Sequence, residues 1–240
     1  MSVEAVLFDL DDTLFDHQYC SRAALWCVRQ DHPALSAASW EELQGAYSRL
    51  LEEIHARLLE GEFSLEQARR ERFRLLFLEL GEEAPDELVR SAVEGYGRAY
   101  RRSWRVVPGA EELLRRVGER TTVAVVTNNL LREQQDKLSS LGLERYVDAL
   151  FASEEVGAAK PEPEIFRVAL QSLGCAPNEA VMVGDSWAND VLGARAAGIP
   201  AVWLNARGVK CPEPSLAREI RALEPAEEVL ELLDERRSGV

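Results

Sequence analysis

Near its start the chain reads Val3-Glu4-Ala5-Val6-Leu7-Phe8-Asp9-Leu10-Asp11-Asp12-Thr13, and this stretch decides the fold. Its apolar half is typical of a strand that is covered on both faces of a sheet. Because side chains alternate along extended backbone, Asp9 and Asp11 are expected to project to the same side. Two charges about 4 Å apart repel by roughly 1 to 4 kcal/mol, so a divalent cation or a retained proton should offset them. On these residues alone, an acidic loop that simply leaves the core is the alternative.

The composition indicates a folded protein with an acidic surface. The chain has 240 residues, of which 46% are hydrophobic and 29% charged, and its formal net charge is −14. This length suffices for one large core, or for a core with a smaller appended unit. An acidic surface excludes long-range attraction to nucleic acid or to an anionic membrane, so neither is an expected partner.

Cysteine usage and hydropathy predict a soluble, cytoplasmic protein. The four cysteines form no CxxC pair, so neither a zinc site nor a disulfide framework is indicated, and reduced thiols are expected. No apolar run approaches the length of a membrane span, and no basic N-terminal segment leads into a long apolar stretch.

Two kinds of pattern divide the chain. Residues 16–105 show apolar positions at three-to-four spacing without a convincing strand, which predicts an all-helical domain. Residues 1–15 and 106–240 instead alternate strands with helices, and the β-branched run at 121–127 is the clearest later strand. Further strands are predicted at 149–153, 180–184 and 201–205. This alternation predicts an α/β core with a Rossmann-like parallel sheet and helices on both faces.

Reactive groups in such a sheet gather at the carboxyl ends of the strands. Thr127 and Asn128 end one predicted strand, where a hydroxyl and backbone N–H groups can hold an anionic oxygen. Thr-Asn-Asn is also a common way for a chain to leave a strand. Lys160 precedes a predicted helix, where its ammonium and the helix dipole both favour an anion, although an isolated lysine is more often a solvated surface residue.

A second acidic segment follows the predicted strand at 180–184. Gly184 allows a tight turn, and Asp185 directly after it has the hard oxygens and the placement of a Mg²⁺ ligand. Asp190 lies in the opening turn of the next predicted helix. It is either part of the site or a helix-start carboxylate without a catalytic role.

Four segments together resemble the four ordered motifs of the haloacid dehalogenase-like hydrolase superfamily. They are Asp9-Leu10-Asp11-Asp12-Thr13, Val126-Thr127-Asn128, Lys160-Pro161 and Gly184-Asp185-Ser186 through Asp190. The inserted helical domain at 16–105 resembles the C1-type cap of that superfamily. One departure is Asn129, where nucleotidase and sugar-phosphate phosphatase branches often have glycine.

The resemblance implies a reaction and a role for each motif residue. Asp9 would be the nucleophile that attacks phosphorus to give an aspartyl-phosphate, and Asp11 would be the general acid and base. Thr127, Asn128 and Lys160 would hold the phosphoryl group.

The resemblance also implies a Mg²⁺ cofactor. Its ligands would be Asp9, the backbone carbonyl of Asp11, and Asp185. Asp190 would act as a further ligand or as an orienting partner for Lys160. A carboxylate attacks phosphorus only if the phosphate charge is masked, which the metal and the lysine would accomplish.

The predicted function is a Mg²⁺-dependent phosphatase that hydrolyses a small phosphomonoester, of nucleotide or sugar-phosphate type. A phosphomutase of the same superfamily and a non-catalytic binding or regulatory protein are the alternatives. A dehalogenase is disfavoured, because the superfamily's dehalogenases lack the second aspartate that Asp11 provides. The expected partner is a small phosphorylated metabolite, and either a monomer or a homodimer is compatible with the sequence. Three residues of the predicted cap are hypothetical contacts of the leaving group of that metabolite: His17, Tyr19 and Trp26.

Overall fold

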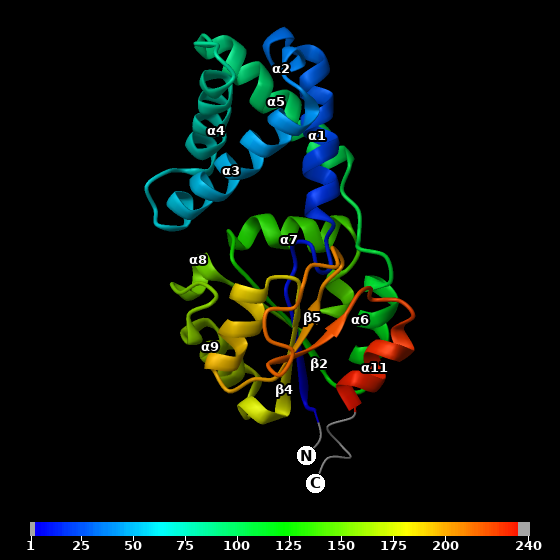
Figure 1. Cartoon of the computed structure of the whole chain (residues 1–240). Coiled ribbons are helices and arrows are strands. Elements are labelled where there is room, and N and C mark those ends of the chain that lie inside the picture. Colours follow the sequence, from blue (N-terminus) through cyan, green and yellow to red (C-terminus); the bar gives the residue numbers. More distant parts are fainter. Residues whose placement is uncertain (1–2, 235–240) are drawn as a thin grey trace. The chain divides into compact units, whose positions relative to one another are not determined.

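The structure, a computed structural model, describes residues 3–234, which fold into two compact units (Figure 1). One unit contains the residues up to Asp16 and those from Arg105 onward, and the other is His17–Trp104. The first is an α/β unit and the second is helical throughout its regular elements. None of the helices formed by the described residues combines the length and the apolar character that a membrane crossing requires.

The strands of the α/β unit pair in parallel within one sheet. In spatial order they are β3 (Ala149–Ala152), β2 (Thr122–Thr127), β1 (Ala5–Phe8), β4 (Ala180–Gly184), β5 (Ala201–Leu204) and β6 (Ala217–Ile220). β1 is central, and its Phe8 is in register with Val125 of β2 and with Val183 of β4. The carboxyl ends of these three strands therefore meet at one edge. The predicted α/β fold with a Rossmann-like parallel sheet is confirmed.

The edge strand β6 is a strand that the sequence pattern did not indicate. Two of its four residues, Arg218 and Glu219, are charged, and only Ile220 is buried. Backbone pairing with β5 forms it, rather than a hydrophobic pattern of its own. The other later strands lie within one residue of their predicted bounds.

Helices cover both faces of the sheet (Figure 1). α9 (Pro163–Leu173) packs on one face, where its Ile165 and Phe166 join Leu7 of β1 in a buried cluster. α6 (Ala110–Gly118) and α11 (Ala226–Asp234) lie on the opposite face. The remaining helical segments are α7 (Leu131–Ser140), α8 (Ser153–Val156), α10 (Gly193–Ala196), η1 (Glu144–Tyr146), η2 (Pro177–Glu179) and η3 (Trp187–Leu192).

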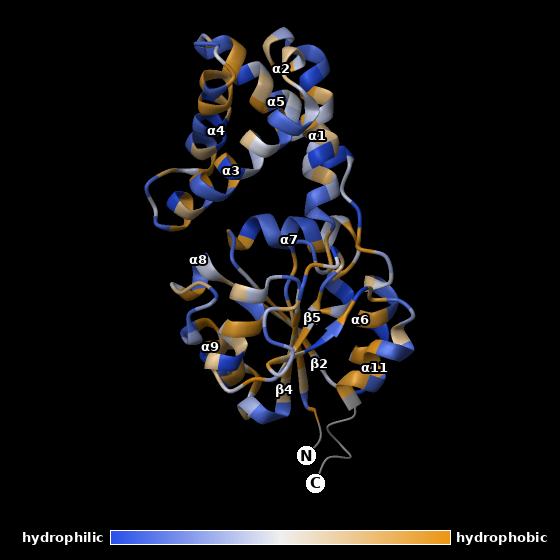
Figure 2. Cartoon of the chain, in the orientation of Figure 1, coloured by the Kyte–Doolittle hydropathy of each residue, from blue (hydrophilic) through white to orange (hydrophobic). Residues whose placement is uncertain are grey.

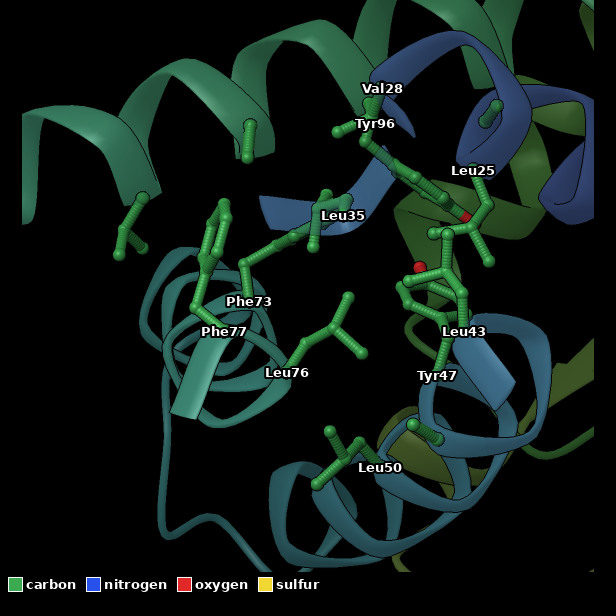
Figure 3. Close-up of a cluster of buried hydrophobic side chains, with 14 residues drawn as sticks. Leu25, Val28, Leu35, Leu43, Tyr47, Leu50, Phe73, Leu76, Phe77 and Tyr96 are labelled. Carbon is green, nitrogen blue, oxygen red and sulfur yellow. The ribbon is translucent and has the colours of Figure 1, made fainter. Parts of the chain in front are cut away.

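The helical unit has a hydrophobic core of its own (Figure 3). Its helices are α1 (His17–Asp31), α2 (Pro33–Ala37), α3 (Trp40–Leu59), α4 (Leu65–Glu79) and α5 (Asp86–Arg102). The Tyr47 ring of α3 contacts Phe73 of α4 and Tyr96 of α5, with ring centroids 5.8 and 5.3 Å away. Buried aromatic rings contribute much of the apolar area in such a core, so these contacts hold three helices together.

Capping boxes start the two helices that contribute half of the buried residues of this core. Ser39 begins α3, where its hydroxyl accepts a hydrogen bond from the backbone N–H of Glu42 while the Glu42 carboxylate accepts one from the backbone N–H of Ser39. Ser64 and Gln67 form the same arrangement at the start of α4. Each box satisfies two backbone donors that a helix start would otherwise leave unpaired.

The segment that precedes the helical unit and the segment that follows it pair with each other. Phe15 and Val106 form an antiparallel bridge. The Arg105 guanidinium donates to the Asp16 carboxylate at 2.6 Å. These contacts allow a long helical insertion without opening the sheet.

We expect Phe73→Ala to lower the free energy of unfolding by about 3–5 kcal/mol, because it removes a fully buried ring and leaves a cavity. Urea denaturation followed by circular dichroism measures this loss. Leu78→Ala in the same helix is the matched control, since Leu78 is 52% exposed. Its effect should stay within about 0.5 kcal/mol. Equal losses from the two substitutions would contradict a packed core around Phe73.

Candidate active site

The turn after β1 places Asp9 and Asp11 at the open edge of the sheet. The Asp9 N–H extends the strand pairing by donating to the Val183 carbonyl at 2.9 Å. The Leu10 carbonyl then accepts backbone hydrogen bonds from the residues that follow, which closes a tight turn. Asp12 in this turn has a φ of 64°, a left-handed conformation that aspartate tolerates better than most residues. The chain therefore reverses directly after presenting its two acids.

The Lys160 ammonium lies between two buried carboxylates. Its Nζ is 2.6 Å from Asp9 Oδ1 and 2.7 Å from Asp190 Oδ1. The side chains of Lys160 and Asp190 are 3% and 1% exposed. Lys160 is the cation that both carboxylates share, so removing it would leave two buried negative charges uncompensated.

The end of β4 is shaped to admit Asp190. A Cβ on Gly184 would collide with the Asp190 carboxylate, so only glycine permits this approach. The Ser186 N–H donates to Asp190 Oδ2 at 2.9 Å, while Oδ1 accepts from Lys160. Both Asp190 oxygens thus already have hydrogen-bond donors.

Asp185 is held through its main chain. Its N–H donates to the Thr13 hydroxyl at 3.1 Å, and its carbonyl accepts a hydrogen bond from the Trp203 indole at 2.8 Å. These contacts tie the end of β4 both to the turn after β1 and to β5. The Asp185 carboxylate remains available for the site.

Three carboxylates form a cluster that fits a divalent cation. One ligand oxygen from each of Asp9, Asp185 and Asp190 lies within 4.8 Å of the others. Burial raises the pKa of Asp9 to about 7; Lys160 opposes this shift and Asp190 adds to it. Burial likewise raises the pKa of Asp185 to about 8, with Asp9 and Asp190 adding to the shift. Burial is the largest cause of both shifts, and the neighbouring carboxylates add to it. Hard carboxylate oxygens are also a donor set suited to Mg²⁺.

Asn128 fixes the segment that contains Lys160. Its Nδ2 donates to the Lys160 carbonyl and its Oδ1 accepts from the Lys160 N–H, both at 2.7 Å. The side chain that was expected to hold phosphate is thus engaged with the main chain of the lysine. Asn128 positions Lys160 through this contact.

A second lysine, which the sequence reasoning did not identify, contacts the other acid. Lys137 of α7 places its Nζ 2.5 Å from Asp11 Oδ1. Gln134, also on α7, donates to Asp11 Oδ2 at 3.1 Å and to the Thr127 hydroxyl at 2.8 Å. Asn129, at the position where some branches of the superfamily often have glycine, donates to the same Asp11 oxygen at 3.3 Å. The sequence has only three lysines, so each could have been considered as a candidate site residue, and this was the available signal for Lys137.

The structure thus brings the predicted residues into two groups at one sheet edge. Asp9, Lys160, Asp185 and Asp190 form the first. Asp11 joins Thr127 through Gln134 in the second. The Asp11 charge contributes to the raised pKa of Asp9, so the two groups are electrostatically linked.

The hypothetical leaving-group contacts all lie on α1 of the helical unit. The Nδ1 of His17 is 2.7 Å from the Tyr100 hydroxyl of α5. Tyr19 and Trp26 are 44% and 49% exposed. Their role in binding a leaving group stays a prediction.

Known proteins are similar in sequence to this chain over most of its length. Residues 3–198 match the family described as haloacid dehalogenase-like hydrolase. A phosphoserine phosphatase of Thermus thermophilus is 39% identical over 61% of this chain and 59% of its own length, so the match spans less than two thirds of that relative. A ribulose-1,5-bisphosphate 5-phosphatase of Halopiger xanaduensis is 33% identical over 82% of this chain and 83% of its own.

A solved structure shares the fold over most of the chain. It is the HAD-hydrolase YfnB of Bacillus subtilis bound to magnesium, with a TM-score of 0.79 and 25% identity, covering 98% of this chain and 100% of that one. The four motifs begin with Asp9 and end with Asp190, inside the matched residues 3–198. The resemblance inferred from those motifs is therefore confirmed: the chain belongs to the haloacid dehalogenase-like hydrolase family.

Proposed function

We propose that this protein is a Mg²⁺-dependent phosphomonoesterase that forms an aspartyl-phosphate on Asp9. The observation that carries the proposal is that two acids at one sheet edge each contact a buried lysine, Asp9 with Lys160 and Asp11 with Lys137. Phosphoester hydrolysis needs a nucleophile and a proton-transfer group held close together, and these two acids supply both.

Asp9 is the proposed nucleophile, with Lys160 as its charged neighbour. Burial alone would lower the pKa of Lys160, but Asp190 and Asp9 outweigh it and raise that pKa above its ordinary value. The ammonium therefore stays charged and can bind a phosphoryl oxygen. Asp190, whose oxygens both accept hydrogen bonds, is the orienting partner of this lysine.

Asp9 and Asp185 are the proposed side-chain ligands of Mg²⁺, which when bound masks phosphate charge. The Thr127 hydroxyl can donate to a second phosphoryl oxygen, because Gln134 already donates to its oxygen.

Asp11 is the proposed general acid and base. As an Asp9 oxygen bonds to phosphorus, the bond to the leaving alkoxide breaks and Asp11 gives that alkoxide a proton. Asp11 then takes a proton from water as the water oxygen attacks phosphorus. The phosphorus bond to Asp9 breaks, its electron pair returns to the carboxylate, and phosphate leaves.

A small phosphorylated metabolite is the proposed substrate. The two relatives described above are named for phosphoserine and for ribulose-1,5-bisphosphate, both small metabolites that carry phosphomonoester groups. The helical unit His17–Trp104, inserted after the first strand, is the proposed cap domain. Caps of this kind exclude water and select the leaving group.

The direct test is turnover of nucleoside monophosphates, sugar phosphates and phosphoserine with Mg²⁺, with inorganic phosphate as the measured product. Phosphate release supports the proposal. Conversion of one sugar phosphate into another without phosphate release would identify a phosphomutase. No turnover of any phosphoester in the panel would identify a non-catalytic binding protein.

We expect Asp9→Asn to lose essentially all turnover, because an amide cannot form the aspartyl-phosphate. Asp11→Asn should lose about 10²- to 10⁴-fold, the usual contribution of a positioned acid–base group. Initial rates with an alkyl phosphate measure both, and circular dichroism confirms that each variant is folded. Wild-type turnover by Asp9→Asn would refute the assignment of the nucleophile.

We expect Mg²⁺ to stabilise the protein more at high pH than at low pH. With pKa values of about 7 and about 8, Asp9 and Asp185 hold protons in the metal-free folded chain that the unfolded chain releases above about pH 4. Their contribution to the free energy of unfolding therefore falls as the pH rises from about 4 to about 8. Mg²⁺ binds the ionised carboxylates, so its stabilisation should increase over this range, to about 2.7 kcal/mol at ~100 times its Kd.

Thermal unfolding with and without MgCl₂, at about pH 5.5 and about pH 8, measures this difference. The Tm should rise by about 5–10 °C at the higher pH and by much less at the lower one. Asp185→Asn is the control and should abolish most of the rise. The same Mg²⁺ effect at both pH values, or in the variant, would argue against this metal site.

A further inference from the structure

Polar side chains on one face of helix α7 are buried inside the α/β unit. Figure 2 shows α7 as hydrophilic along most of its length, yet Gln134 and Lys137 on one of its faces are only 0% and 4% exposed. Burying an amide and an ammonium is unfavourable unless both find hydrogen-bond partners. The contacts of both side chains lead to Asp11.

Lysine is rare in this chain, and its distribution is informative. Among 28 basic residues only Lys137, Lys160 and Lys210 are lysines. Lys210 is exposed, whereas the other two are buried and each contacts an aspartate of the site. An ammonium concentrates its charge at one point, while a guanidinium spreads it over a planar fork. Lys137 thus contacts Asp11 through one charged nitrogen, as Lys160 contacts Asp9 and Asp190.

Donors approach both oxygens of the Asp11 carboxylate. Lys137 Nζ contacts Oδ1 at 2.5 Å and lies 4.8 Å from the centroid of the Phe15 ring. Gln134 Nε2 and Asn129 Nδ2 contact Oδ2 at 3.1 and 3.3 Å. Contacts from three directions fix both the position and the plane of the carboxylate.

Gln134 connects this arrangement to Thr127. One amide nitrogen serves both the Asp11 carboxylate and the Thr127 hydroxyl. The Oε1 atom of Gln134 is buried and has no hydrogen-bond partner among the described residues. Rotating the amide would turn this oxygen toward the Asp11 carboxylate, which also accepts hydrogen bonds only. The Asp11 carboxylate needs a donor at this position, so it determines which way the Gln134 amide is turned.

We propose that Lys137 is the positioning residue of Asp11, and that with Gln134 and Asn129 it holds the carboxylate in place for proton transfer to the leaving group. This inference rests on the proposed function, because it concerns the acid of that reaction. Stability alone does not account for the arrangement, since well-packed apolar side chains commonly stabilise a core as well as a buried ion pair does.

The test compares two substrates whose leaving groups differ in their need for a proton. Lys137→Met keeps the length of the side chain and removes its charge. Its kcat/KM for an alkyl phosphate should fall by about 10- to 100-fold, because the displaced acid protonates the alkoxide poorly. Its kcat/KM for p-nitrophenyl phosphate should fall by less than about 3-fold, because nitrophenolate leaves readily without a proton.

Two further variants separate positioning from general damage. Lys210→Met, at the exposed lysine, should leave both kcat/KM values unchanged. In an Asp11→Asn background, Lys137→Met should cause no further loss with the alkyl phosphate, because the group that it positions is already gone. Equal losses on both substrates, no loss on either, or additive losses in the double variant would each overturn the proposal.

If Lys137→Met does not fold, the two substrates are compared with Lys137→Gln and with Gln134→Leu instead. The outcomes given above for Lys137→Met then support or overturn the proposal in the same way. The wild-type protein distinguishes this inference from the proposed function. A wild type without Mg²⁺-dependent turnover refutes the phosphatase itself, whereas an active wild type with an unselective Lys137 variant refutes only the positioning role.

Discussion

The ammonium of Lys160, buried between Asp9 and Asp190, is the interaction on which the rest of the site depends. Asp9 follows β1, Lys160 lies in the segment before α9, and Asp190 belongs to the helical segment η3, so the parallel sheet must form before the three side chains can meet. Asn128 holds the main chain of the lysine, and Gly184 leaves the space that Asp190 occupies. A buried charge of this kind is tolerated only with partners at close range, so the surrounding backbone has little freedom to change.

The two acids after β1 have different environments, and this difference suits different roles. Asp9 shares its lysine with Asp190 and lies beside Asp185, and burial together with the Asp190 charge raises its pKa although Lys160 opposes the shift. Asp11 instead has a lysine on one oxygen and two amide donors on the other. The first environment attracts a cation, and the second fixes a side chain. Neighbouring carboxylates with contrasting surroundings are a recurrent basis for dividing nucleophilic and acid–base roles.

Much of this arrangement could be predicted from the sequence, because strand ends in a parallel sheet are easy to locate. Short apolar runs marked the strands, and the polar residues after them, such as Asp9 and Asp185, were expected to meet at one edge. The edge strand β6 was missed because charged residues interrupt its pattern. Lys137 and Gln134 were missed for a different reason. They lie within a helix whose polar residues resemble a solvated face, and their partner Asp11 is far away in sequence, so only the fold reveals that this face is buried.

The central place of β1 in the sheet has a consequence for how the chain is made. β1 is hydrogen-bonded on both sides by strands that follow the entire helical insertion in sequence, β2 and β4. During translation β1 has neither neighbour until the chain beyond Thr122 has emerged, and it acquires the second only after Gly184. The helical unit, whose core lies wholly within His17–Trp104, can pack well before that point. The nascent protein can therefore complete its insertion before its sheet, whereas the site at the sheet edge needs strands from both ends of the chain.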